Sequence, residues 1–150
     1  MIRQAIIPLA GLGTRLLPLT SIIPKELLPI NGKTVLEYIL DECIQADIKE
    51  VILIISKKKN MIKQYFQKDK LYKSIIKNKK DKRILKEYKK IKRYKKMLKF
   101  VYQNKPLGTG DAVLRTKKLI KDKYFLMILP DDLIVKNNCS KSIISVHNKF

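Results

Sequence analysis

Short aliphatic runs alternate along the first third of the chain with a segment in which apolar residues recur every three or four positions. Residues 2–8 and 51–55 are rich in β-branched residues, a pattern typical of buried strands in a parallel sheet. Residues 34–46 lie between them at helical spacing, with Thr34 in position to cap the first turn. The pattern therefore predicts a strand, a helix and a second strand.

The same alternation returns in the last third of the chain. Residues 98–102 and 124–129 predict strands, residues 104–110 a turn-rich loop, and residues 112–120 a helix. Strands that alternate with helices favour right-handed crossovers and a mainly parallel sheet with helices on both faces. We therefore predict an α/β, Rossmann-like fold, whose ligands gather outside the carboxyl ends of the strands.

The two ends of this pattern set the expected domain organisation. Residues 140–150 predict a helix that stops without a glycine or proline terminator, so the fold is expected to be incomplete at its C-terminus. A chain of 150 residues, 45% of them hydrophobic, has the size and core material of one domain. We expect residues 1–150 to form a single domain.

Lysine dominates the segment between these halves, residues 57–99. A helix is expected at residues 60–66, residues 77–83 are too polar to bury, and helical spacing returns from Ile84 to Ile91. We interpret the segment as a helical excursion on the outside of the domain with a solvated basic face. A dedicated polyanion site and disorder are the alternatives.

The composition is strongly basic. The chain has 34 Lys and Arg residues against 13 Asp and Glu, a net charge of +21, which favours anionic partners of any kind. Lysine, isoleucine, asparagine and tyrosine share AT-rich codons, so mutational drift explains the excess of lysine. Nucleic acid is not expected as a partner, because no aromatic pattern of a nucleic-acid module accompanies the lysines.

The remaining candidate groups exclude several classes of site. Cys43 and Cys139 are far apart and lack metal-ligand spacing, so neither a zinc site nor a disulfide framework is expected. His147 is the only histidine and is assigned no role. With no signal peptide and no apolar run long enough for a bilayer, we expect a cytoplasmic protein.

The loop after the first predicted strand carries candidate phosphate-binding groups. Gly11 and Gly13 allow close approach of a ligand to the backbone, and Arg15 supplies a fixed fork of donors. A dinucleotide-binding loop would need glycine in place of Leu16, and the Gly-Lys-Ser/Thr of a P-loop is absent. A plain structural turn is the alternative.

Two further segments carry charged residues in restricted positions. Lys25 and Glu26 stand between Pro24 and Pro29, where restricted backbone angles suit a rigidly placed phosphate-binding lysine; a solvated turn is the alternative. Asp131 follows the last predicted strand, where an aspartate can form an Asx turn.

Four separated motifs, in this order, resemble the signature of the bacterial sugar nucleotidyltransferases. They span nearly the whole chain: G-L-G-T-R-L-L-P-L-T at 11–20, P-K-E-L-L-P at 24–29, Gln103 with G-T-G-D-A-V at 108–113, and L-P-D-D at 129–132. The resemblance implies a nucleotidyltransferase version of the Rossmann-like fold, with residues 1–150 as a single nucleotide-binding domain.

Within that family, the residues of these motifs most resemble those of the uridylyltransferases that act on UTP and glucose 1-phosphate. The second motif and E-C-I at 42–44 carry this likeness, whereas thymidylyl-transferring relatives typically have Gly-Gly in the first motif and Lys-Gln in place of Lys25-Glu26. Asp111 departs from the pattern, since uridylyltransferases often carry histidine there. Transfer from dTTP, ATP or CTP therefore stays open.

The resemblance also implies a role for individual residues. Two groups would contact the nucleotide: the base would meet the backbone of Leu9, Ala10 and Gly11 together with Gln103 and Gly108, and the triphosphate would meet Gly13, Thr14 and Arg15. Lys25 would neutralise the α-phosphate region. Asp131 would bind Mg²⁺, with Asp132 the less favoured ligand.

The implied reaction is in-line attack of glucose 1-phosphate on the α-phosphate of UTP, giving UDP-glucose and pyrophosphate. The attacking oxygen is already anionic, so Arg15, Lys25 and Mg²⁺ are expected to act by positioning and charge stabilisation. In the family, a second metal-binding aspartate and most of the sugar pocket lie beyond the part that matches this chain. We therefore expect nucleotide binding with poor turnover by this chain alone, and a homo-oligomer is possible; a basic polyanion-binding remnant is the alternative.

Overall fold

A four-stranded parallel sheet forms the centre of the computed structural model, which describes residues 1–78, 81–134 and 136–149. The strand order is β5, β4, β1, β6, and the strands are β1 (Gln4–Pro8), β4 (Glu50–Ile55), β5 (Leu98–Tyr102) and β6 (Leu126–Met127). The predicted α/β fold with a parallel sheet is confirmed. β6 is shorter than the strand predicted at residues 124–129, and pairs with β1 through two residues only.

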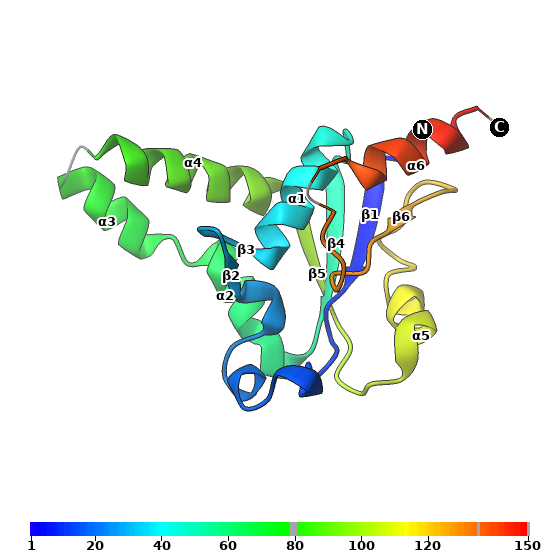
Figure 1. The fold of residues 1–150 in the computed structure, drawn as a ribbon, viewed down its shortest axis with the longest axis horizontal. Coiled ribbons are helices and arrows are strands. Elements are labelled where there is room, and N and C mark those ends of the chain that lie inside the picture. Colours follow the sequence, from blue (N-terminus) through cyan, green and yellow to red (C-terminus); the bar gives the residue numbers. More distant parts are fainter. Residues whose placement is uncertain (79–80, 135, 150) are drawn as a thin grey trace.

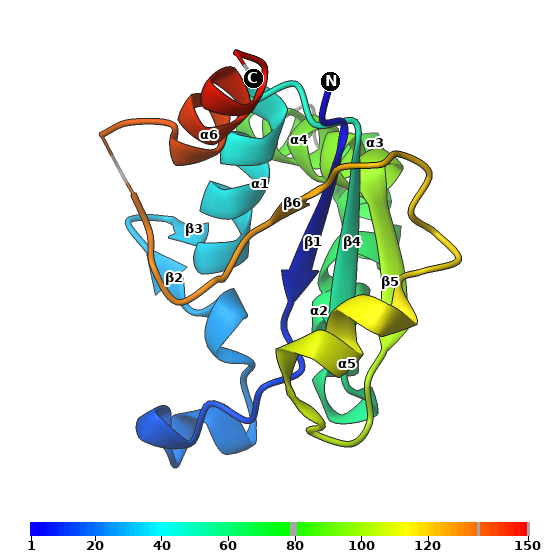
Figure 2. The same cartoon turned by 90° about the vertical axis from the view of Figure 1, so that its right-hand side faces the viewer.

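Helices cover both faces of this sheet (Figure 2). Alternate residues of β1 point to opposite faces: Ala5 and Ile7 join the larger core, and Ile6 joins the smaller one. The larger core is closed by α1 (Val35–Gln45), α2 (Asn60–Gln67), α4 (Lys82–Met97) and α6 (Cys139–His147), and the smaller core by α5 (Gly108–Arg115). The carboxyl ends of β1, β4 and β5 all lie at the same edge of the sheet.

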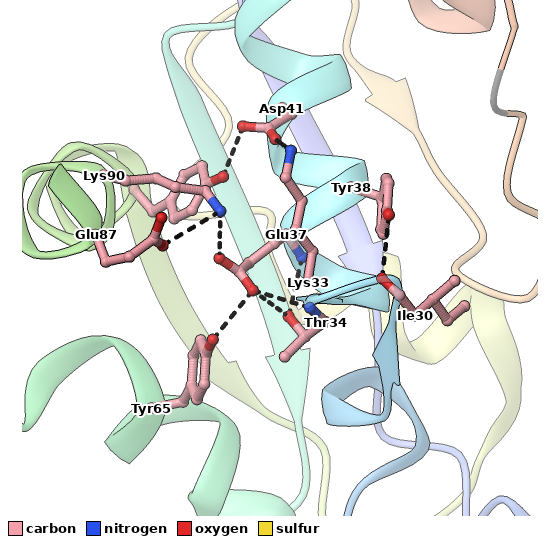
Figure 3. A network of polar contacts seen from close by, with 10 residues as sticks. Ile30, Lys33, Thr34, Glu37, Tyr38, Asp41, Tyr65, Glu87 and Lys90 are labelled. Carbon is pink, nitrogen blue, oxygen red and sulfur yellow. Dashed lines mark hydrogen bonds and ion pairs between the residues drawn. The ribbon is translucent and has the colours of Figure 1, made fainter. Parts of the chain in front are cut away.

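A capping box fixes the start of α1, and the predicted N-cap at Thr34 is confirmed. Thr34 Oγ1 accepts from the Glu37 amide at 3.2 Å, and the Glu37 carboxylate accepts from the Thr34 amide at 2.9 Å. The Glu37 carboxylate also accepts hydrogen bonds from Lys90 Nζ at 2.8 Å and from Tyr65 Oη at 3.1 Å. This one buried side chain therefore connects α1 to α2 and α4 (Figure 3).

The lysine-rich segment is helical, as predicted. It comprises the short 3₁₀ helix η4 (Lys57–Lys59), then α2, α3 (Lys70–Asn78) and α4; α3 and α4 lie side by side and extend away from the sheet (Figure 1). Tyr72 and Tyr88 stack between these two helices, with ring centroids 6.0 Å apart. Residues 79–80 of the polar stretch at 77–83 lie outside the described residues.

Two predictions about the last third of the chain need correction. α5 begins at Gly108 inside the expected loop, and ends at Arg115 rather than at residue 120. Leu119 and Ile120, which suggested a longer helix, pack against the smaller core from a turn that follows buried Thr116. α6 spans Cys139–His147 and so covers much of the helix predicted at 140–150; residue 150 lies outside the described ranges. His147 contacts the Tyr124 ring edge-on.

The remaining sequence expectations concern cysteines and membranes. Cys43 is buried in the larger core and Cys139 is half-buried; both are free thiols. Burial raises the pKa of the Cys43 thiol to about 12, so this group is an unreactive core residue. None of the helices that the structure describes combines the length and apolar character that a membrane crossing requires.

Candidate nucleotide site

The loop after β1 is held in a tight conformation around Gly13. Gly13 has φ 69°, and a Cβ atom there would lie 3.2 Å from Thr20 Cγ2. Thr20 Oγ1 donates to the Gly13 carbonyl oxygen at 2.8 Å, which fixes the loop. Thr14 and Arg15 follow in the 3₁₀ helix η1 (Thr14–Leu16), and the loop continues through η2 (Leu19–Ser21). This arrangement presents Arg15 to solvent at the sheet edge.

The proline-framed loop forms the 3₁₀ helix η3 (Lys25–Leu27) and leads into a small hairpin of β2 (Pro29–Ile30) and β3 (Lys33–Thr34). Lys25 Nζ forms an ion pair with the carboxylate of Asp131, which lies in the loop after β6, 106 positions along the chain. Two motifs that are remote in sequence are therefore in contact. Asp131 keeps 65% of its side chain exposed, so it remains open to a ligand.

Glu26 faces away from Lys25 and into the protein, where its side chain is only 1% exposed. Both carboxylate oxygens accept from Lys59 Nζ, at 2.8 and 2.9 Å. Lys59 is thus buried, which corrects the expectation that the lysines of residues 57–99 are solvated. Sequence reasoning missed this lysine, because a run of three lysines gives no sign that one of them turns inward.

Gln103 follows β5 and is almost completely buried, with 6% of its surface exposed. Its backbone amide donates to the Ile55 carbonyl at 2.9 Å, which continues the pairing of β5 with β4. Its side-chain Nε2 donates to the Gly108 carbonyl at 3.0 Å and to Asp111 Oδ2 at 2.8 Å. These contacts bring the start of α5 against the end of β5.

Two adjoining cavities occupy this edge of the sheet. A cleft of about 770 Å³ is bordered by η1, η3, β2 and the loop after β6, and a pocket of about 250 Å³ by the loops after β1 and β5 and by α5. Lys25, Glu26, Pro130 and Asp131 border both cavities. The Lys25–Asp131 pair therefore stands at the junction between them.

The sequence-predicted residues fall into these cavities in two groups. The expected triphosphate residues line the cleft (Gly13, Thr14, Arg15, Lys25), and the expected base residues line the pocket (Ala10, Gly11, Gln103, Gly108). Leu9 lines neither cavity: its side chain is buried in the larger core, and its amide donates to the Ile54 carbonyl at 2.7 Å. Asp132 also lines neither.

A sequence model described as nucleotidyl transferase matches residues 4–149 of the chain. The chain belongs to the nucleotidyl transferase family. The family membership inferred from the four motifs is therefore confirmed.

The chain is similar to several UTP–glucose-1-phosphate uridylyltransferases. It is 52% identical over 68 residues to the enzyme of Mycoplasma pneumoniae, and the match covers 45% of this chain and 23% of the relative. It is 48% identical over 65 residues to the enzyme of Escherichia coli K12, and the match covers 43% of this chain and 22% of the relative. The predicted resemblance to uridylyltransferases is confirmed at this level of similarity.

Solved structures extend the likeness to nearly the whole of this chain. A UTP-bound UGPase from Acinetobacter baumannii has a TM-score of 0.85 at 31% identity, covering 99% of this chain and 53% of that one. A UDP-glucose pyrophosphorylase complexed with UDP-glucose has a TM-score of 0.78 at 29% identity, covering 99% and 54%. The chain thus spans about half the length of these structures.

The carboxylate of Asp131, at the junction of the two cavities, is compatible with a magnesium ion. No cluster of three or more His, Cys, Asp or Glu side chains with metal-binding geometry occurs in the described part of the chain. Asp131 would supply one or two oxygen ligands. Mg²⁺ commonly keeps several waters and takes further ligands from substrate phosphates, so this sparse donor set is compatible with Mg²⁺ that arrives with a nucleotide.

Proposed function

We propose that this chain binds UTP and that the protein transfers a uridylyl group from UTP to glucose 1-phosphate, giving UDP-glucose and pyrophosphate. The observation that carries the proposal is the Lys25–Asp131 ion pair at the junction of the cleft and the pocket. It brings the cation proposed to bind phosphate and the carboxylate proposed to bind metal together between the two cavities. The names of the similar proteins support the choice of UTP and glucose 1-phosphate.

The two cavities suggest how the nucleotide lies. The pocket beside Gln103 would hold the base, and the wider cleft beside Arg15 would hold the phosphates, with the α-phosphate near Lys25 at the junction. Arg15 is exposed and offers several donors, so it suits the terminal phosphates, which carry most of the charge. Residues 1–150 would act together as the nucleotide-binding unit.

The proposed chemistry needs neither a nucleophilic side chain nor a general base. The sugar phosphate attacks the α-phosphorus in line as an anion, and pyrophosphate departs from the opposite side. Lys25 would neutralise charge on the α-phosphate, and Arg15 would hold the departing phosphates, so two anions that repel each other are kept in line. Mg²⁺, when bound, stabilises the charge on the phosphate oxygens.

Binding of nucleotide would rearrange the ion pair at the junction. Lys25 would turn from Asp131 to the α-phosphate, and Asp131 would be released to hold Mg²⁺. Each group would exchange one oppositely charged partner for another, so neither is left without a counter-ion. This exchange explains how a preformed ion pair is compatible with both proposed roles.

Calorimetric titration of the chain with UTP, dTTP, ATP and CTP in the presence of Mg²⁺ tests the proposal, and UTP should bind most tightly. Lys25→Ala should weaken UTP binding roughly ten- to hundredfold, since a hydrogen bond to a charged group contributes about 1.5–3 kcal/mol. Arg15→Ala should weaken it similarly. Lys118→Ala removes one exposed positive charge outside both cavities and should leave UTP affinity unchanged.

Several outcomes decide against the proposal. Tighter binding of another nucleotide would assign the site to a different nucleotidyl transfer. No UTP binding, combined with tight DNA or RNA binding that falls steeply with salt, would support the polyanion-binding alternative. Formation of UDP-glucose is measured separately, in this chain and in a protein of the relatives' full length, and we expect the chain alone to be the slower of the two.

A further inference from the structure

The amide of Gln103 has one chemically allowed orientation. Its Nε2 lies 3.0 Å from the Gly108 carbonyl oxygen and 2.8 Å from Asp111 Oδ2. A carbonyl and a carboxylate only accept hydrogen bonds, so the opposite orientation would place Oε1 against two oxygen atoms. Asp111 stays ionised, because hydrogen bonds from Arg115 and then from Gln103 hold the pKa of its carboxyl below the usual range. The nitrogen end of the amide is therefore fixed.

The opposite end of the amide, Oε1, is the end left to contact a ligand in the pocket that Gln103 lines. Gln103 lines the 250 Å³ pocket together with Ala10 and Gly108. No donor contacts Oε1 among the residues that the structure describes, and in those residues the one fully buried side-chain polar atom without a partner is Ser56 Oγ. Oε1 is therefore accessible to solvent, as an acceptor directed at a ligand would be.

Asp111 is itself held by a second contact. Arg115 lies one turn further along α5 and donates hydrogen bonds to both carboxylate oxygens of Asp111. Its Nε lies 2.7 Å from Oδ2 and its Nη2 lies 3.3 Å from Oδ1. This two-point contact restricts rotation of the carboxylate. A chain of contacts thus runs from Arg115 through Asp111 to the amide of Gln103.

We infer that Asp111 and Arg115 are positioning residues that make the base pocket selective for uracil over cytosine by fixing Gln103 Oε1 as an acceptor. The inference rests on the proposed UTP site. Uracil carries a hydrogen on N3 and donates to Oε1, whereas cytosine presents a lone pair at N3, which repels it. An amide free to turn over would offer its NH₂ group to cytosine and lose this discrimination.

The ratio of UTP to CTP affinity, measured by calorimetry, tests the inference. Asp111→Ala should lower this ratio roughly two- to tenfold, the value of one net hydrogen bond. The ratio cancels any effect of charge on the shared triphosphate. Asp111→Asn keeps an acceptor oxygen and should retain most of the wild-type ratio. Asp69→Ala, which breaks the Asp69–Lys73 pair of the same spacing at the start of α3, should leave the ratio unchanged.

Hydrogen exchange of the Gln103 side-chain amide, followed by NMR without nucleotide, provides a readout independent of binding. Exchange should be slow in the wild type and in Asp111→Asn, and faster in Asp111→Ala and Arg115→Ala. An unchanged affinity ratio or unchanged exchange in Asp111→Ala overturns the inference, even when UTP binding stands. Absence of UTP binding by the wild type removes the proposed function first, so the two failures are distinguishable.

Discussion

The buried ion pair between Glu26 and Lys59 explains why a charged residue follows Lys25 in the proline-framed loop. The Glu26 carboxylate is buried and pairs with Lys59, and this ion pair connects η3 to η4 inside the protein. Its neighbour Lys25 is thereby held at the junction of the two cavities. Of these two adjacent charged residues, Lys25 contacts Asp131 between the cavities and Glu26 contacts Lys59 in the protein interior.

Removing one partner of this pair should destabilise the protein strongly. We expect Lys59→Met to lower the free energy of unfolding by about 3–5 kcal/mol, because it leaves the Glu26 carboxylate buried without a counter-ion. The double variant Glu26→Leu, Lys59→Met should recover part of this loss. Urea unfolding measures both, with Lys58→Met on the exposed neighbour as the control. Equal stability of the two single lysine variants would contradict the assignment.

Two glycines should respond oppositely to the same substitution. Gly13→Ala should destabilise the fold by about 1–3 kcal/mol, because a positive φ is unfavourable for alanine and its Cβ would approach Thr20. Gly110→Ala meets no atom within 4 Å and lies inside α5, so it should stabilise by about 0.5–1 kcal/mol. Thermal unfolding of both variants checks this. A stabilised Gly13→Ala variant would show that the loop is not constrained as described.

At the scale of elements, α1 is the point of attachment for the lysine-rich helices. Glu37 accepts from Lys90 and Tyr65, and Asp41 accepts from Tyr94 Oη at 2.6 Å and from Lys33 Nζ at 2.8 Å (Figure 3). Through these carboxylates, α1 holds α2, α4 and the β2–β3 hairpin. The hairpin borders the cleft, so the network also supports one wall of the ligand site.

The Glu37 network predicts a loss of stability in acid. Burial alone would raise the pKa of Glu37, but hydrogen bonds from Lys90, the Thr34 amide and Tyr65 together lower it below the usual 4.5. A carboxyl whose pKa is lower in the folded state stabilises the fold above its unfolded pKa, and this contribution disappears as the pH falls through the folded value. The free energy of unfolding should therefore decrease on acidification below pH 4.5.

Urea unfolding along a pH series measures this contribution. Glu37→Gln should be less stable than the wild type at neutral pH and should lose less stability on acidification, because the titrating group is gone. Asp122→Asn, on an exposed carboxyl, serves as the matched control and should follow the wild-type profile. A wild-type slope in Glu37→Gln would exclude Glu37 as a source of the acid sensitivity.

At the scale of the whole molecule, most charged residues lie outside the apolar core clusters. The buried clusters are apolar, while α3 and α4 carry rows of exposed lysines on a projecting hairpin (Figure 1). Tyr72 of α3 stacks on Tyr88 of α4, and α4 packs against the larger core, whereas α3 has no buried residue. The exposed lysines of both helices lie on the outer surfaces of the hairpin. The chain has a net charge of +21, so repulsion among its positive side chains destabilises the compact folded state.

Screening by salt should therefore stabilise the fold. The melting temperature should rise between about 0.05 and 0.5 M NaCl, since salt at the higher concentration screens charges over a few ångströms. Replacing three exposed lysines of α4 by glutamine (Lys82, Lys86, Lys89) should raise the melting temperature at low salt and reduce its salt dependence. A melting temperature that falls with salt would show that attractive ion pairs dominate instead.

The sequence by itself determined the elements and the chemistry of the motifs. The apolar run of β4 and the helical spacing of α1 were sufficient because burial of a continuous apolar face depends on local periodicity. Thr34 identified the start of α1, since capping is a contact within one turn. The strand-end and glycine motifs also indicated which loops gather at the same edge of the sheet.

Only the tertiary structure decided which of these groups meet. The ion pairs of Lys25 with Asp131 and of Glu26 with Lys59, and the start of α5 at Gly108, depend on how the chain returns to the sheet edge. The burial of Lys59 had no local signal, because its neighbours are also lysines. Periodicity records which face of an element is buried, but a long-range contact between polar side chains depends on the packing of whole elements and leaves no period in the sequence.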